Sequence, residues 1–290
     1  MPHNLTDKLM VITGASSGIG AATGLACARA GMDVVLAARR VEKLEAVAEQ
    51  IRVLGRRALV VACDVNRDED VAGLFEQAWA EFDRIDVVFA NAGYGLFGTV
   101  MDTDLQTHRD IFETNYYGTL RTLREAVPYL KKTNAENPGA GAYPGAGAGG
   151  GLKHLLICSS VVSEVGIPMF SAYCATKAAQ DSVAGAMRAE LADEGIHITS
   201  VHPVGTSTEF GKQAREHSAN NAASKREFNT PKAFEQTPEH VANKIVGALR
   251  RPRPEVWPST LSRYAAALTT ASPRLAAWVM RRHMRKIKQG

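Results

Sequence analysis

The chain has 290 residues, of which 45% are hydrophobic and 22% are charged, the balance of an ordinary globular protein with one large domain. Its formal net charge of +4 is too small to indicate nucleic-acid binding, and no apolar run approaches the length of a membrane-spanning helix. Residues 1–8 lack the apolar stretch of a secretory signal. The four cysteines form no C-x-x-C pair and no His cluster has metal-ligand spacing, so we expect no metal site and a cytoplasmic location.

Short apolar runs alternate with amphipathic stretches through most of the chain. The apolar runs predict strands over residues 8–13, 33–37, 58–62, 87–91, 154–159 and 197–202. Helical periodicity covers residues 18–30, 41–54, 68–81, 103–131 and 172–192. Strands that are almost entirely apolar are buried on both faces, as in a parallel sheet. We therefore predict a doubly wound, Rossmann-like α/β fold with about seven parallel strands in the order 3-2-1-4-5-6-7 and helices on both faces.

Two segments interrupt this alternation. Residues 133–151 are mostly Gly, Ala, Pro and Asn, which predicts a flexible surface loop. Residues 206–236 are polar, follow the sixth strand and show no distinctive recognition residues, and we interpret them as a substrate lid. We expect residues 1–258 to form one dinucleotide-binding and catalytic domain.

Residues 259–290 are expected to form a helical, basic extension. Ser272 can cap a helix, Pro273 suits its first turn, and Leu275, Trp278 and Val279 then share one face among arginines. One interpretation is a helix packed on the body or on a partner subunit. The other is a helix that lies on a membrane surface, which would make the protein membrane-associated.

A glycine-rich loop joins the first strand to the first helix. In Thr13-Gly14-Ala15-Ser16-Ser17-Gly18-Ile19-Gly20, Gly14 can take the tight turn, Gly18 allows close approach of a pyrophosphate, and Gly20 allows the helix to pack on the strand. The helix N-terminus then presents free N–H groups to the phosphates. The loop predicts binding of a dinucleotide through Gly14, Ser16, Ser17, Gly18, Ile19 and Gly20.

The end of the second strand indicates which dinucleotide is bound. NAD-binding proteins usually place an acidic residue there to hold the ribose 2′-hydroxyl. This strand instead ends in Arg39 and Arg40. Because guanidinium groups match a phosphate in charge and geometry, we predict NADP(H) as the cofactor.

Three residues after the fifth strand carry acid/base chemistry. Ser160 follows the strand, and Tyr173 and Lys177 are four residues apart on one helical face. Lowering a tyrosine pKa from about 10 to about 7 requires roughly 4 kcal/mol, which an ammonium about 4 Å away supplies at an effective dielectric constant of ~20. An oxidised nicotinamide adds positive charge. We expect Tyr173 to act as general acid and base while Ser160 polarises the substrate oxygen.

These motifs resemble the short-chain dehydrogenase/reductase family, in its branch of single-domain members with ~250 residues. The resemblance covers about residues 5 to 258 and rests on the glycine-rich loop, on Asn91-Ala92-Gly93, and on Ser160, Tyr173 and Lys177. It implies further roles at matching positions, where Lys177 also binds the nicotinamide ribose and Asn115 holds a water for a proton relay. It also implies cofactor contacts by Asp64, Val65, Asn91, Ala92, Gly93, Pro203, Thr206 and Thr208. The chain departs from the family where Val204 replaces a glycine.

The leading hypothesis is an NADP(H)-dependent enzyme that interconverts a small-molecule carbonyl and an alcohol. One alternative is a non-catalytic NADP-binding sensor or scaffold, and another is a reductase of lipids or steroids at a membrane surface. By analogy with the family we expect a homodimer or homotetramer. We expect no nucleic-acid partner.

Overall fold

The computed structural model describes residues 1–136, 151–206, 209–218 and 235–289. Seven parallel strands form one sheet in the order β3-β2-β1-β4-β5-β6-β7, as predicted. The strands are β1 (Leu9–Thr13), β2 (Asp33–Ala38), β3 (Ala58–Ala62), β4 (Val87–Ala90), β5 (His154–Cys158), β6 (His197–Val201) and β7 (Glu255–Val256). Because all of them run in the same direction, their carboxyl ends meet at one edge, where ligands bind in open α/β sheets.

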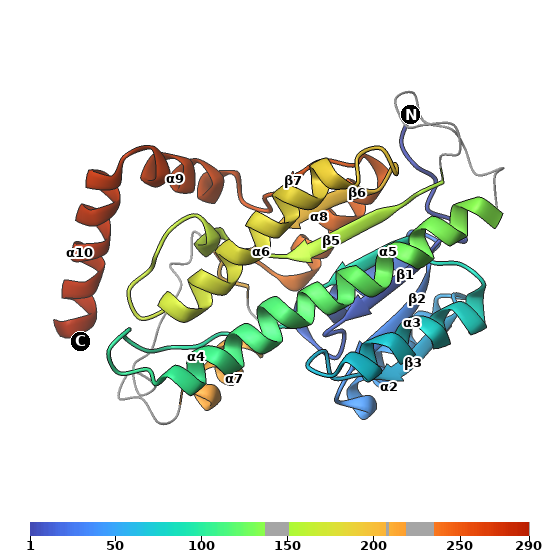
Figure 1. Cartoon of the computed structure of the whole chain (residues 1–290), viewed down its shortest axis with the longest axis horizontal. Coiled ribbons are helices and arrows are strands. Elements are labelled where there is room, and N and C mark those ends of the chain that lie inside the picture. The colour runs from blue at the N-terminus through green and yellow to red at the C-terminus, as the bar shows by residue number, and fades with distance from the viewer. Residues whose placement is uncertain (137–150, 207–208, 219–234, 290) are drawn as a thin grey trace.

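Helices cover both faces of the sheet (Figure 1). One buried cluster joins the sheet to α1 (Gly18–Arg29), α2 (Val41–Val53) and α8 (Pro238–Arg250). A second cluster joins the other face to α3 (Asp68–Phe82), α5 (Gly118–Glu136) and α6 (Ser171–Glu190). Alternate residues of β1 supply the two clusters, since Met10 and Ile12 belong to the first and Leu9 and Val11 to the second.

The stretch predicted as one helix over residues 103–131 is divided in the structure. It consists of α4 (Leu105–Phe112), a π-helical turn over Glu113–Tyr117, and α5. The prediction of a continuous helix was wrong at this turn, because apolar periodicity does not distinguish an α-helix from one that contains a single wide turn. Pro128 lies inside α5.

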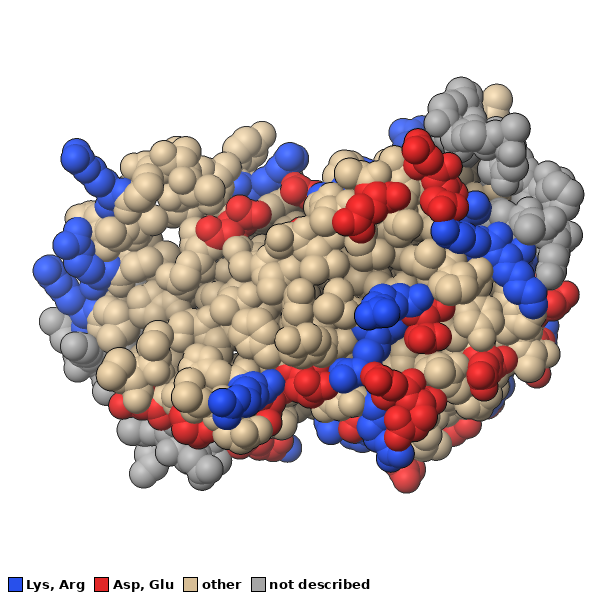
Figure 2. Space-filling model, in the orientation of Figure 1, with Lys and Arg blue, Asp and Glu red and all other residues tan. Residues whose placement is uncertain are grey.

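Two helices follow β7 at one end of the molecule (Figure 1). They are α9 (Thr260–Ala271) and α10 (Pro273–Gln289), and the Ser272 hydroxyl accepts a hydrogen bond from the Leu275 amide at the start of α10. Lys and Arg side chains gather at this end of the surface (Figure 2). Among the described helices, none has the length and apolar character needed to cross a bilayer.

The two irregular segments predicted from the sequence are described only in part. Residues 137–150 of the glycine-rich stretch lie outside the described residues, as do 207–208 and 219–234 of the expected lid. The described part of the lid contains α7 (Phe210–His217), and a β-bridge joins Thr206 to Gln236.

Candidate active site

A cleft of about 950 Å³ lies at the carboxyl edge of the sheet. It is lined by most of the residues predicted to bind cofactor or substrate, namely Gly14, Ser16, Ser17, Gly18, Ile19, Arg39, Arg40, Asp64, Val65, Asn91, Ala92, Gly93, Ser160, Tyr173, Lys177, Pro203 and Thr206. Gly20 and Asn115 do not line it, and Thr208 lies outside the described residues. The strand ends of the parallel sheet thus bring residues from distant parts of the sequence together.

The glycine-rich loop leaves the first turn of α1 open toward the cleft. Gly14 has a φ of +66°, and a Cβ atom there would lie 2.7 Å from the Cα of Ala92, so the position requires glycine. A Cβ atom on Gly20 would collide with the Gly14 carbonyl oxygen. Ser17 is the extended N-cap residue of α1, with no side-chain capping bond and no acidic residue in the following turn. The amides at this helix start therefore suit an anionic pyrophosphate.

Asn91 fixes this loop to the neighbouring strand. Its side-chain nitrogen donates hydrogen bonds to the carbonyl oxygens of Thr13 and Gly14, each 3.1 Å long. In return, the Thr13 hydroxyl accepts hydrogen bonds from the amides of Asn91 (3.1 Å) and Ala92 (3.3 Å). The end of β4 thereby holds the loop at the end of β1.

The two arginines after β2 have different partners. The Arg40 guanidinium donates to the hydroxyls of Ser16 (2.9 Å) and Ser17 (3.0 Å) and forms an ion pair of 2.9 Å with Glu209. Lys43 also binds the Glu209 carboxylate. The side chain of Arg39 is 71% exposed, and its Nη1 lies 4.0 Å from Asp64 Oδ2.

The sequence analysis did not identify Lys43 or Glu209 as site residues. Lys43 lies three residues after Arg40 at the start of α2, a spacing that places both on one helical face and could have been noticed. Glu209 is 169 residues away from Arg40, and nothing in the sequence indicates that contact. These two cations already hold a carboxylate, so the same position can hold another anion.

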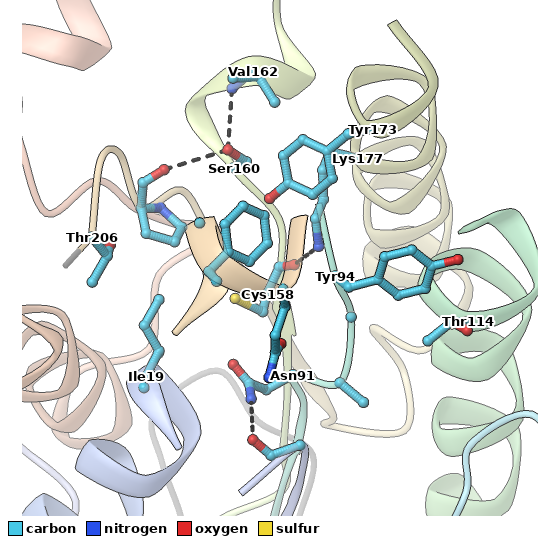
Figure 3. Close-up of a pocket in the computed structure, with 18 of the residues that line it drawn as sticks. Ile19, Asn91, Tyr94, Thr114, Cys158, Ser160, Val162, Tyr173, Lys177 and Thr206 are labelled. Atoms are coloured by element: carbon cyan, nitrogen blue, oxygen red, sulfur yellow. Dashed lines mark hydrogen bonds between the residues drawn. The ribbon is translucent and has the colours of Figure 1, made fainter. Parts of the chain in front are cut away.

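Ser160, Tyr173 and Lys177 meet on one wall of the cleft (Figure 3). Ser160 lies two residues after the end of β5 and caps a short 3-10 turn, while Tyr173 and Lys177 lie in the first two turns of α6. The Tyr173 hydroxyl hydrogen-bonds Ser160. Lys177 Nζ donates a 2.6 Å hydrogen bond to the Cys158 carbonyl oxygen and lies 5.5 Å from the centre of the Tyr173 ring.

Burial dominates the electrostatics of this cluster. It raises the pKa of Tyr173, and the hydrogen bond from Ser160 acts in the opposite direction. Burial also lowers the pKa of Lys177. The pKa of Tyr173 is raised, whereas the sequence analysis expected it to be lowered. Burying the phenolate away from water costs more free energy than the Ser160 hydroxyl and the Lys177 ammonium recover by stabilising it. The phenol therefore keeps its proton at neutral pH in this structure.

Asn115 lies in the π-helical turn, behind the cleft. Its side-chain oxygen accepts a hydrogen bond from the Tyr94 amide at 2.9 Å, and its side-chain nitrogen donates to the Tyr94 carbonyl and to Thr176. Its main-chain carbonyl accepts from Thr119 (2.7 Å) and Gln180 (2.6 Å). The structure thus gives Asn115 a positioning role toward the chain at Tyr94, and the predicted water relay stays a prediction.

Val204 stands where the family usually has glycine, and in this chain the glycine comes one residue later, at Gly205. Gly205, not Val204, has a positive φ of +44°, and the Val204 amide donates to the Gln236 side chain at 3.3 Å. The next residue, Thr206, has a buried Oγ1 with no hydrogen-bond partner among the described residues. Because Thr206 lines the cleft, this hydroxyl is available to a ligand there.

The part of the cleft next to Tyr173 is apolar. The Phe210 ring of α7 lies 5.4 Å from that of Tyr173, and the Phe97 and Phe170 rings pack edge to face at 4.5 Å. Val162 packs in the same apolar cluster, and Ile167, Val279 and Met280 also line the cleft. Phe210 belongs to the segment interpreted as a lid without distinctive recognition residues, and its polar sequence context gave no sign that it lines the cleft beside Tyr173.

Comparisons with known proteins agree with this architecture. The family model described as short chain dehydrogenase matches residues 8–219. The chain is 30% identical over 282 residues to the Uncharacterized oxidoreductase YxnA of Bacillus subtilis, covering 97% of this chain and 73% of that protein. It is also 30% identical over 249 residues to Glycine betaine reductase ATRR of Emericella nidulans, covering 86% of this chain but 18% of that longer protein.

A solved structure with the same fold carries a nicotinamide cofactor analogue. It is an alcohol dehydrogenase from the archaeon Thermococcus sibiricus complexed with 5-hydroxy-NADP, 28% identical, with a TM-score of 0.69 over 86% of this chain and 94% of that one. Within the described residues, no group of three His, Cys, Asp or Glu side chains could hold a metal ion. The chain belongs to the short-chain dehydrogenase/reductase family of oxidoreductases.

Proposed function

We propose that the protein is an NADP(H)-dependent oxidoreductase that interconverts a carbonyl and an alcohol on an apolar small molecule. One observation carries the proposal: Ser160, Tyr173 and Lys177 line the same cleft as the glycine-rich loop and the arginines after β2. A proton carrier and a dinucleotide site in one cleft are the two parts that this reaction needs.

The residues of the cleft fit the cofactor along its length. The open start of α1 would hold the pyrophosphate, and Arg39 and Arg40 would hold the 2′-phosphate. Asp64 and Val65 would contact the adenine side, while the unpartnered Thr206 hydroxyl would bind the carboxamide. When bound, the cofactor supplies or accepts the hydride.

The side chains on the catalytic wall handle the proton. Ser160 would donate a hydrogen bond to the substrate oxygen, and Tyr173 would donate its proton to that oxygen during reduction. Burial raises the pKa of Tyr173, so the phenol holds a proton for reduction but is a weak acid until the Lys177 ammonium and the bound cofactor favour the phenolate. After the transfer, the nearby Lys177 ammonium would stabilise the phenolate.

The test is NADPH oxidation over a panel of ketones, aldehydes, steroids and acyl thioesters, with the Tyr173→Phe variant in parallel. We expect Tyr173→Phe to lower kcat/KM by about 10²-fold or more and to leave NADPH binding largely intact. Tyr94→Phe is the matched control, because it removes another phenol from the same cleft.

Two results would contradict the proposal. Retained turnover in Tyr173→Phe would remove Tyr173 from the mechanism. Tight NADPH binding without turnover on any substrate of the panel would favour the alternative of a non-catalytic sensor or scaffold.

A further inference from the structure

Helix α9 exposes an apolar stripe to solvent. Its buried side carries Ser262 and Ala266, while Leu261, Tyr264 and Leu268 are 56%, 69% and 61% exposed. These three residues follow one another at helical spacing, so they share one face. An amphipathic helix normally turns its apolar face to the core, and α9 does the reverse.

Helix α10 has two different faces. Val279 and Met280 line the catalytic cleft. On the opposite side Trp278 is 55% exposed, while Leu275, one turn before Val279 on the same face, is 37% exposed. The helix therefore forms a wall with the cleft on one side and solvent on the other.

Arginines surround Trp278 on the outer side of α10. Trp278, Arg281, Arg282 and Arg285 line a hollow of about 400 Å³, and the Arg282 guanidinium carbon lies 5.7 Å from the centre of the Trp278 ring. None of these arginines forms an ion pair with the residues that the structure describes. Arg281 Nε donates to the Ala277 carbonyl, but no carboxylate of the described residues neutralises these three guanidinium groups, which leaves their charge for phosphate oxygens.

The net charge of the segment that forms α9 and α10 is opposite in sign to the net charge of the rest of the chain. Residues 259–290 contain seven Lys and Arg residues and no Asp or Glu, whereas the whole chain carries +4, so the other residues together carry −3. The cationic side chains gather at the end of the molecule formed by α9 and α10 (Figure 2). An anionic surface would attract this end and repel the body.

We propose that the outer face of α9 and α10 binds an anionic phospholipid membrane. The face combines exposed Leu and Tyr side chains, a tryptophan of the kind enriched at membrane interfaces, and unpaired arginines for lipid phosphates. Exposed apolar side chains beside cations of a single sign match a bilayer that presents an apolar interior under a layer of anionic headgroups. Helix α10 would then lie between the membrane and the cleft. That apolar substrates reach the cleft from the lipid is a consequence that rests on the proposed function, whereas membrane binding itself does not.

The test is co-flotation of the full chain with vesicles of phosphatidylcholine alone or with added phosphatidylserine. We expect binding to the serine-containing vesicles that weakens as salt is raised. Replacing Arg281, Arg282 and Arg285 together by Glu should weaken it by more than tenfold, since each basic residue near such a surface contributes about fivefold.

A matched control carries the same change of charge elsewhere. Lys244, Arg250 and Arg251 on and after α8 are exposed and lie near the N-terminus, where the His3 amide donates to the Arg250 carbonyl at 2.7 Å. Replacing these three by Glu should leave most of the binding intact. Replacing Leu261, Tyr264 and Leu268 by Ser should weaken binding while its salt dependence persists, and circular dichroism should show that each variant is folded.

Three results would overturn the proposal. They are no binding of the folded full chain to either vesicle, equal salt-independent binding to both, and equal losses in the two charge variants. Sedimentation also tests a second copy as the occupant: dissociation of an oligomer by the α10 substitutions, without vesicle binding, would assign this face to self-association. None of these measurements needs turnover, so their failure is distinct from failure of the proposed function.

Discussion

Replacing Glu209 by Gln should tighten NADPH binding without changing NADH binding. The Glu209 carboxylate occupies Arg40 at 2.9 Å and also binds Lys43. A 2′-phosphate that uses Arg40 must share or displace this carboxylate, and the two anions repel each other. NADH has no phosphate at that position and does not compete.

The magnitude follows from the exposure of the three side chains. Arg40, Lys43 and Glu209 are 39%, 44% and 41% exposed, so each ion pair is screened by water and contributes ~0.2–1 kcal/mol. For two pairs the competition is about 1 kcal/mol, which corresponds to about a fivefold gain in NADPH affinity for Glu209→Gln.

Calorimetric titration of NADPH and NADH into the wild type and the variant measures this gain. Glu45→Gln is the control, because Glu45 is exposed on the same helix as Lys43, does not line the cleft and pairs with Arg52 instead. Weaker NADPH binding in Glu209→Gln, or equal changes for both cofactors, would refute the reasoning, because Glu209 would then position Arg40 for the phosphate.

The pH dependence provides a second check. Hydrogen bonds from Lys43 and Arg40 lower the pKa of Glu209 to about 2. A lowered folded-state pKa means that the carboxylate stays charged from neutral pH down past its ordinary range, and that its contribution is lost only as the pH falls toward 2. The Glu209 charge is therefore constant between pH 8 and pH 5, and the difference between wild type and Glu209→Gln should fall only as the 2′-phosphate takes up a proton at about pH 6.

Three further predictions concern the cofactor site and the core. Arg39→Ala should lower the affinity for NADPH far more than that for NADH in the same titration. Equal losses of affinity would contradict the prediction that Arg39 binds the 2′-phosphate. Gly20→Ala should abolish binding of both cofactors, seen as loss of fluorescence transfer to NADPH, because its Cβ would collide with the Gly14 carbonyl. Burial lowers the pKa of His154 to about 3, so below about pH 6.5 the imidazole takes up a proton when the protein unfolds. Urea melts should therefore show the free energy of unfolding falling as the pH drops below about 6.5. His154→Gln should reduce that slope, and an unchanged slope would contradict the role of His154.

The strands and the site motifs could be predicted from the sequence, and the strand order came with the doubly wound fold class. Parallel strands buried on both faces must be apolar throughout, and the tight turn with a positive φ at Gly14 favours glycine by its backbone shape alone. The apolar character of a buried strand is a local property, so residues 9–13 and 154–158 show it by composition alone. For the same reason Ser160, Tyr173 and Lys177 could be selected, since α6 sets the separation of the last two.

Contacts between distant segments were decided only by the tertiary structure. The pairing of Glu209 with Arg40, the position of Phe210 beside Tyr173 and the wide turn at Asn115 leave no periodic trace in the sequence. The direction of the Tyr173 pKa shift also required the fold, because it depends on how completely the surrounding chain excludes water. The sequence by itself determined the elements and the reactive groups, whose causes are local, whereas the structure determined partners and burial, which arise only when remote parts of the chain pack together.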